Sequence, residues 1–218
     1  LQACREVTDT ESYLFIQTSQ ANMILNNEFD TIYHEHLSFF NTLSMRTAAN
    51  LNGFSLIDVF KTEVHGGSYV FVLRKGKHSE MLANREIFLE RSIGLQDYDT
   101  YVEYAKKCKQ VTQDLVKEVD SFRDQGYKII GYGAAAKGNT FLNFAQLKLD
   151  YIVDDNELKW DLLTPGMDIP IRNPECLKEE DYEKIVIVPL AWNFFREIRE
   201  NVETRTGTTE IKFIKYFP

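Results

Sequence analysis

Four side chains that can move or orient protons are adjacent near the start of the sequence. They are Tyr33, His34, Glu35 and His36, and they include two of the chain's four histidines. Imidazole exchanges protons near neutral pH, and a neighbouring carboxylate can orient it and stabilise its charged form. The run therefore predicts proton-transfer chemistry. Two other interpretations stay open: a polar loop whose histidines bond to backbone groups, and a metal site built from His34, His36 and His65.

A second candidate site is a glycine-rich turn, which predicts phosphate binding. Gly131 and Gly133 lie between a predicted strand and a predicted helix, the setting in which helix amides face a phosphate. Lys137 adds a positive charge, and Asn139 follows in the same run. Asp154 ends the next predicted strand, where an acid can accept a hydrogen bond from a ribose hydroxyl. The alternative is a tight strand-to-helix turn that holds no ligand.

Two more candidate ligand contacts, Trp192 and Asn193, follow the next long apolar run at 184–189. Open α/β sheets bind ligands at the carboxyl ends of their strands. An indole and an amide at this position suit stacking or hydrogen bonding with a sugar or a base. Trp192 fits ordinary packing equally well.

Apolar periodicity predicts the elements that position these residues. Apolar runs predict strands at 13–18, 55–61, 69–74, 127–131, 151–155, 184–189 and 211–216, the first of them buried. Helical spacing predicts helices at 43–53, within 79–125, at 139–145 and at 194–203. A long helix ending near Gly126 carries an apolar stripe, expected to pack on a domain, with a dimer interface as the alternative. The stripe consists of Tyr101, Ala105, Cys108, Leu115, Val119 and Phe122.

Composition excludes several classes of protein. A net charge of −8 and a pI of about 5.1 argue against nucleic acid or an anionic membrane as partner. No apolar run approaches the roughly 20 residues of a membrane span. The three isolated cysteines predict a reducing, cytoplasmic location without disulfides. Because the chain starts at Leu1, we expect it to be part of a longer protein.

Several motifs occur in one order along the chain. They are FDTIYHEH at 29–36, HGGS at 65–68, GYGAAAKGNT at 131–140, PG at 165–166, IPI at 169–171 and AWN at 191–193. Together they resemble the nucleotide-sugar C-methyltransferases that use S-adenosylmethionine, over nearly the whole chain from about Tyr13. The resemblance implies an α/β fold in three segments. Residues 1–76 would be the C-terminal part of a class I methyltransferase sheet, 77–125 a helical linker, and 126–218 a small doubly wound Rossmann-like domain.

The resemblance also implies roles for individual residues. His36, beside Glu35, would be the base that removes a proton next to a keto group, and Tyr33 would support the keto sugar or its enolate. His34 ranks lower than His36 as the candidate base. Ser68 matches the family's glycine-glycine-serine turn. The other implied substrate contacts are Gly131, Gly133, Lys137, Asn139, Asp154, Trp192 and Asn193.

The expected ligands follow from the same resemblance. A nucleoside-diphosphate sugar would bind this chain, the S-adenosylmethionine site would lie mostly outside it, and zinc would belong to an N-terminal region that this sequence lacks. A homodimer is a further expected partnership, since an uncovered half sheet favours pairing. Two alternatives remain: a sugar-nucleotide-binding module without turnover, and a nicotinamide-dependent oxidoreductase. Lys137 and the absence of a catalytic tyrosine-lysine pair disfavour the oxidoreductase.

Overall fold

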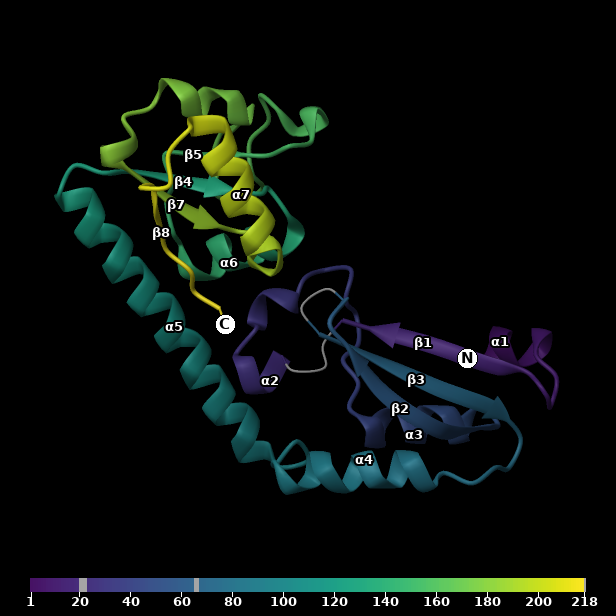
Figure 1. The fold of residues 1–218 in the computed structure, drawn as a ribbon. Helices are drawn as coiled ribbons and strands as arrows, with labels where there is room; N and C mark the ends of the chain where they lie inside the picture. Colours follow the sequence, from purple (N-terminus) through teal and green to yellow (C-terminus); the bar gives the residue numbers. More distant parts are fainter. Residues whose placement is uncertain (20–22, 65–66, 218) are drawn as a thin grey trace. The chain divides into compact units, whose positions relative to one another are not determined.

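A computed structural model describes residues 1–19, 23–64 and 67–217 of the chain (Figure 1). The chain forms two compact units, each built from two stretches of sequence. Leu1–Leu25 and Glu35–Ala105 form the first unit, and Asn26–His34 and Lys106–Pro218 form the second. The division between them falls inside the histidine run.

The first unit contains a three-stranded antiparallel sheet in the order β1-β3-β2. From Gln2 to Asp124 the chain forms α1 (Gln2–Val7), β1 (Tyr13–Thr18), α2 (Met23–Asn26), η1 (Phe29–Thr31), α3 (Thr42–Leu51), β2 (Phe54–Thr62), β3 (Ser68–Lys75), α4 (Met81–Ser92) and α5 (Tyr98–Asp124). Of these, η1 and the larger part of α5 belong to the second unit. Tyr13 of β1 lies opposite Arg74 of β3, and Phe54 of β2 lies opposite Lys75. The predicted antiparallel hairpin is therefore confirmed, although His65 and Gly66 of its turn lie outside the described residues.

Helix α3 provides the core of this unit. The Asn41 side chain accepts from the Ser44 amide and caps the helix at its N-terminus. Met45 and Ala49 then pack against the sheet, in a cluster that includes Phe71 of β3. The helix begins and ends close to the prediction, because its apolar spacing and its cap are both local in sequence.

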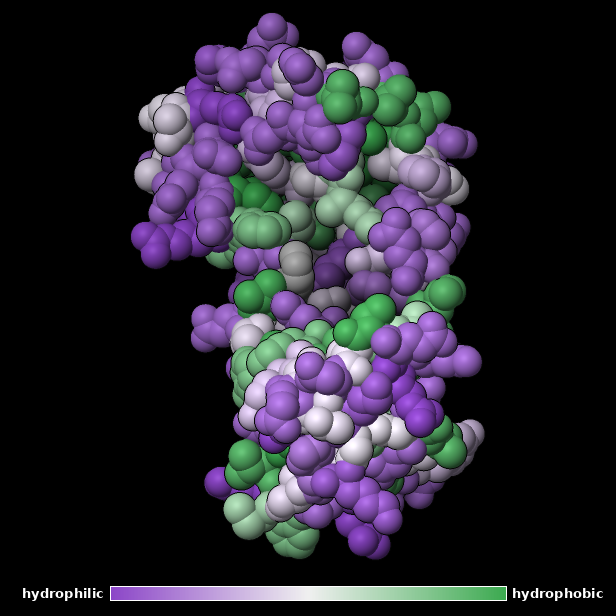
Figure 2. Space-filling model, turned by 90° about the vertical axis from the view of Figure 1, so that its right-hand side faces the viewer, coloured by the Kyte–Doolittle hydropathy of each residue, from purple (hydrophilic) through white to green (hydrophobic). Residues whose placement is uncertain are grey.

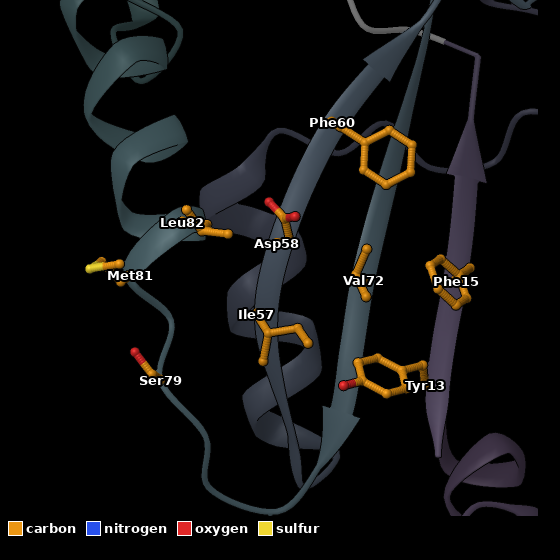
Figure 3. Close-up of a pocket in the computed structure, with 9 residues that line it drawn as sticks. All are labelled: Tyr13, Phe15, Ile57, Asp58, Phe60, Val72, Ser79, Met81 and Leu82. Atoms are coloured by element: carbon orange, nitrogen blue, oxygen red, sulfur yellow. The ribbon is translucent and has the colours of Figure 1, made fainter. Parts of the chain in front are cut away.

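The opposite face of this sheet is open, which corrects one prediction. The strand at 13–18 is present but not buried: Tyr13 is 54% exposed and Phe15 60%. Both line a shallow groove of about 480 Å³ with Val72, Phe60 and the start of α4 (Figure 3). Sequence hydrophobicity identified the strand correctly, but burial requires a covering layer, and the described part of the chain places none over this face.

The second unit is a parallel five-stranded sheet in the order β6-β5-β4-β7-β8. Its later elements are β4 (Lys128–Tyr132), α6 (Ala136–Ala145), β5 (Tyr151–Val153), η3 (Glu157–Lys159), β6 (Ile171–Arg172), η4 (Pro174–Glu179), η5 (Tyr182–Lys184), β7 (Ile185–Pro189), η6 (Trp192–Phe194), α7 (Phe195–Thr206) and β8 (Lys212–Phe213). Ile198 and Val202 of α7 pack on alternate strand residues such as Ile130 and Ile187. The predicted Rossmann-like architecture is confirmed. The strand β6 was missed, because two residues carry no periodic signal.

The apolar stripe of α5 is confirmed in its C-terminal half and wrong in its first turns. Cys108, Leu115 and Val119 are buried, whereas Tyr101 and Ala105 are exposed and Tyr104 is buried in their place. Over the described residues no helix is long and apolar enough to cross a membrane. On the face seen in Figure 2, hydrophobic side chains form small patches among hydrophilic ones.

The strand order reverses between β4 and β7, which brings the glycine-rich turn after β4 beside the segment that follows β7. Close packing fixes this neighbourhood: a Cβ on Gly138 would lie 2.6 Å from the Cβ of Leu190, and one on Gly133 would lie 3.0 Å from that of Ala191. Gly133 also has a φ of +91°, which favours glycine. The turn and the start of α6 are thus held tightly against the 190–192 segment.

We expect Gly138→Ala to lower the free energy of unfolding by about 1–3 kcal/mol, because the added methyl group overpacks against Leu190. Thr140→Ala on the same helix is the control, since its hydroxyl donates to the Ala136 carbonyl of the same helix. That change should stay within about 0.5 kcal/mol. Urea unfolding followed by circular dichroism measures both, and equal midpoints for Gly138→Ala and the unmodified chain would contradict the tight packing.

Candidate functional site

The first part of the histidine loop, Asn26–His34, is built into the second unit by an aromatic cluster. Phe29 of η1 is buried and has its ring centroid 5.6 Å from that of Phe141, 4.6 Å from Phe144 and 5.8 Å from Phe217. Phe141 and Phe144 belong to α6, the helix that follows the glycine-rich turn. Burying a phenylalanine ring of this kind contributes roughly 1.5–3 kcal/mol. The loop segment is therefore a packed part of this domain.

A buried hydrogen bond joins the same segment to the strand end after β7. The indole Nε1 of Trp192 donates to Oδ2 of Asp30 over 2.7 Å. Asp30 has no exposed surface and Trp192 is only 7% exposed. Hydrogen bonds to a charged acceptor are stronger than neutral ones. The bond thus ties the histidine loop to the carboxyl end of the parallel sheet.

Lys137 brings a positive charge to this cluster from the first turn of α6. Its Nζ lies 5.1 Å from the centroid of the Trp192 ring, within the range of a cation–π contact. Its charge also acts on two buried carboxylates, Asp30 and Glu28. The structure therefore brings together two predicted substrate contacts, Lys137 and Trp192, with two acids that the sequence analysis did not select.

Burial raises the pKa of Asp30 above its ordinary value of 3.8. The hydrogen bond from Trp192 and the charge of Lys137 act in the opposite direction. Burial likewise raises the pKa of Glu28, against the hydrogen bond from the Asn26 side chain and the charge of Lys137. Both shifts follow from removing a carboxylate from water. Lys137 and the hydrogen-bond donors thus offset only part of the effect of burial on these two pKa values.

The glycine-rich turn itself is already bonded from within the protein. Asp154 is buried, and its Oδ2 accepts from the Ala134 amide over 2.7 Å and from Lys159 Nζ over 3.0 Å. Its Oδ1 accepts from the Asn156 amide. The acid that the sequence suggested for a ribose hydroxyl thus caps the turn, so a phosphate at the Ala134 amide would have to displace a carboxylate.

A crevice of about 250 Å³ lies at the strand ends on the side of α7. Asp154, Asp155 and Glu197 are among its lining residues, so it is acidic. Asp155 is paired with Arg205 over 2.7 Å and accepts from the Tyr132 hydroxyl over 2.8 Å. An acidic crevice repels phosphate groups. Of the two sides of the sheet, the side carrying Lys137 suits an anion better.

The remaining predicted residues have different surroundings. His34 and Glu35 form an exposed turn, so the segment is not extended there, and Tyr33 is half-buried with its ring 6.4 Å from that of His34. In the first unit, His36 is half-buried and contacts Phe39 edge to face. Ser68, in the same unit, is buried and donates to the Val64 carbonyl over 2.8 Å.

Two predicted amide contacts belong to the second unit. Asn139 is half-buried, and its side-chain oxygen and its carbonyl accept from Asn143. Asn193 is half-buried in η6, next to Trp192. Asn139 is therefore engaged along its own helix.

No group of three or more His, Cys, Asp or Glu side chains is placed to hold a metal ion within residues 1–19, 23–64 and 67–217. His65, one of the three histidines of the metal interpretation, lies outside these residues.

Sequence reasoning missed Glu28, Asp30 and the aromatic pair Tyr216 and Phe217. Phe217 packs on Trp192 at 5.3 Å, and Tyr216 stacks on Phe141 at 3.9 Å. Asp30 stands inside the FDTIYHEH run, so an acid directly after a phenylalanine was the available signal. Its partner lies 162 residues away in the sequence, and no local pattern identifies it.

Comparison with known proteins adds two similarities. The family model described as the C-methyltransferase C-terminal domain matches residues 63–218. The C-methyltransferase NovU of Streptomyces niveus is 33% identical to this chain over 185 residues, covering 82% of this chain and 44% of NovU. The chain therefore spans less than half the length of this relative.

We expect Asp30→Asn to change how stability depends on pH. Because the pKa of Asp30 is higher in the folded chain than in the unfolded one, the folded chain binds the proton more tightly. Its free energy of unfolding then falls as pH rises from about 4 to the raised pKa, by about 1.4 kcal/mol per pH unit between the two pKa values. Asparagine cannot ionise, so the variant loses this decline.

Urea unfolding at a series of pH values between about 4 and 8 measures the difference between the two chains. Asp124→Asn, at an exposed position on α5, is the control for the loss of one carboxylate. Parallel curves for Asp30→Asn and the unmodified chain would show that Asp30 is ionised as easily in the folded state as in the unfolded state.

Proposed function

The chain belongs to the C-methyltransferase C-terminal domain family, and from this premise we propose that it binds a nucleoside-diphosphate sugar and supplies the proton-abstracting loop for its C-methylation. The methyl donor in this proposal is S-adenosylmethionine. One observation carries the proposal: the histidine loop is packed onto the domain that bears the glycine-rich turn, through Asp30 and Trp192 beside Lys137.

The diphosphate is assigned to the start of α6. The side-chain cap that usually satisfies the first amides of a helix is absent there, and Ala135 occupies the N-cap position. Helix N-terminal amides and a lysine together favour a negatively charged group. Trp192 and Asn193 then lie on the adjacent segment, where they would contact the nucleoside or the sugar.

The proton transfer is assigned to His36. In the proposed reaction its imidazole takes a proton from the sugar carbon next to the keto group, and Glu35 stabilises the imidazolium that forms. The electron pair moves onto the ketone oxygen, and the Tyr33 hydroxyl donates a hydrogen bond to the enolate.

The enolate carbon then forms a bond to the methyl group. S-adenosylmethionine supplies that methyl group on a sulfonium, and the departing sulfur keeps the electron pair of the broken bond as a neutral thioether. We assign no residue of this chain to the donor, because the glycine turn described above is capped by Asp154 and its crevice is acidic.

The first unit fits an origin in a larger methyltransferase sheet. β1 pairs only with β3 among the described residues, and Tyr13 and Phe15 leave an apolar face uncovered. NovU is more than twice as long as the region it shares with this chain. We infer that further strands and a covering layer meet this sheet in the complete enzyme. The functional segments 1–76, 77–125 and 126–218 stay a prediction.

A binding module without turnover is the second candidate function. It is favoured by the location of Lys137, Trp192 and Asn193 within one compact unit, which could hold a nucleotide sugar without the base. A nicotinamide-dependent oxidoreductase is disfavoured, because Asp154 occupies the turn amide that a dinucleotide phosphate would use.

We expect this chain to bind thymidine or uridine diphosphate sugars and not to bind S-adenosylmethionine measurably. Lys137→Met should weaken sugar-nucleotide binding about tenfold or more, because a charge-assisted contact is worth about 1.5–3 kcal/mol. Lys148→Met, at an exposed position just after α6, is the matched control and should leave the affinity unchanged. Isothermal titration calorimetry measures each dissociation constant.

Two results of this titration would contradict the assignments. Equal affinity of Lys137→Met and the unmodified chain would remove the phosphate site from the start of α6. Saturable binding of S-adenosylmethionine at micromolar concentration would show that the donor site lies within this chain.

In the complete enzyme we expect His36→Asn to slow proton removal about a hundredfold or more, in line with the typical contribution of a general base. The direct measurement is exchange of the sugar proton next to the ketone with deuterated water in the absence of a methyl donor. His78→Asn is the matched control, since His78 bonds to the Lys75 carbonyl in the same unit. Unchanged exchange in His36→Asn would exclude His36 as the base.

A further inference from the structure

The Trp192 indole lies between two opposite charges of the second unit. Its N–H donates to Asp30 over 2.7 Å, while Lys137 Nζ lies 5.1 Å from its ring centroid. The indole is buried and is also packed against Phe217 at 5.3 Å. One rigid side chain therefore contacts both the histidine loop and the lysine of the proposed phosphate site.

Asp30 is too deeply buried to contact a ligand. It has no exposed surface, and its hydrogen bond to Trp192 joins segments 162 residues apart. The charged and titratable groups that act on it are Glu28 on its own segment, Lys137 of α6 and the buried hydroxyl of Tyr216 near the C-terminus. Keeping a carboxylate in this position costs free energy unless its donors stay in place. Because Asp30 is enclosed, its effect on function is to fix the position of the chain segment that carries it.

The segment that Asp30 positions leads directly into the proposed proton-transfer residues. Asp30 sits in η1, three residues before Tyr33, and its neighbour Phe29 is held by three rings of the same unit. The aromatic contacts are non-directional, whereas the hydrogen bond to Trp192 fixes one register of the segment. The bond thus selects one placement among those that the apolar cluster would accept.

We propose that Asp30 and Trp192 are positioning residues, which hold the Asn26–His34 segment in a fixed place beside the lysine that binds the substrate diphosphate. The inference rests on the proposed function, and it adds a device that sets where the loop lies relative to the phosphate subsite. Because Asp30 and Lys137 contact the same Trp192 indole, the width of that ring system sets the distance between the loop segment and the proposed diphosphate site.

Hydrogen–deuterium exchange of the ligand-free chain tests the anchor without any substrate. Asp30→Ala and Trp192→Phe should each raise amide exchange of peptides covering 26–34 about tenfold or more, because the segment loses a buried, charge-assisted hydrogen bond. Asp30→Asn keeps an acceptor for the indole and should stay close to the unmodified chain. Trp160→Phe is the matched control, since its indole donates to the Asp154 carbonyl away from the loop.

The exchange data have clear opposing outcomes. A rise confined to the loop peptides in Asp30→Ala and Trp192→Phe supports the anchor. Unchanged loop exchange in both variants overturns it. A rise that also covers the β7 peptides, or that Trp160→Phe reproduces, shows a general loosening of the domain and overturns it as well.

Kinetics of the complete enzyme then separate positioning from binding. Asp30→Ala should lower kcat about tenfold or more and leave KM for the sugar nucleotide within about threefold, and Asp30→Asn should restore most of kcat. A raised KM with unchanged kcat would make Asp30 part of substrate binding and overturn the inference. If the unmodified enzyme transfers no methyl group to any nucleotide sugar, the proposed function fails, and the exchange measurement still decides whether the anchor exists.

Discussion

One buried hydrogen bond, from the Trp192 indole to the Asp30 carboxylate, ties the Asn26–His34 segment to the rest of the second unit. A carboxylate with no exposed surface is tolerated only where donors and a counter-charge stay close. Trp192 supplies the donor and Lys137 the charge. These partners come from two segments at the carboxyl ends of neighbouring strands, so the bond requires the parallel sheet to be formed. In return it makes a stretch of loop from the first half of the sequence part of this domain.

Contacts within the protein also explain the glycine-rich turn. Gly138 is required by the close approach of Leu190, and Gly133 by its positive φ and its contact with Ala191. The turn's Ala134 amide is satisfied by Asp154. The glycines are therefore explained by packing, as the ligand-free interpretation anticipated. The case for an anion rests instead on the uncapped start of α6, on Lys137 and on the indole beside it.

Local patterns in the sequence predicted most of the elements, because a strand or helix is specified by the spacing of its own apolar residues. The strand at 13–18 and the helix α3 show this, the latter with a cap only three residues long. What failed depends on distant partners. Burial of Phe15 requires a layer that no local pattern reveals, and the importance of Asp30 requires a tryptophan 162 residues away. The two-residue strand β6 forms only because β5 offers it an edge.

The boundary between the two units falls within the histidine run. Tyr33 and His34 belong to the unit that carries the proposed phosphate site, whereas Glu35 and His36 belong to the unit with the open sheet. A general base requires precise placement against its substrate, and an error of about 1 Å can cost a hundredfold in rate. The anchored segment fixes only the tyrosine side of the run. The His36 imidazole belongs to the other unit, so in the proposed reaction binding of the sugar nucleotide and its deprotonation depend on different units.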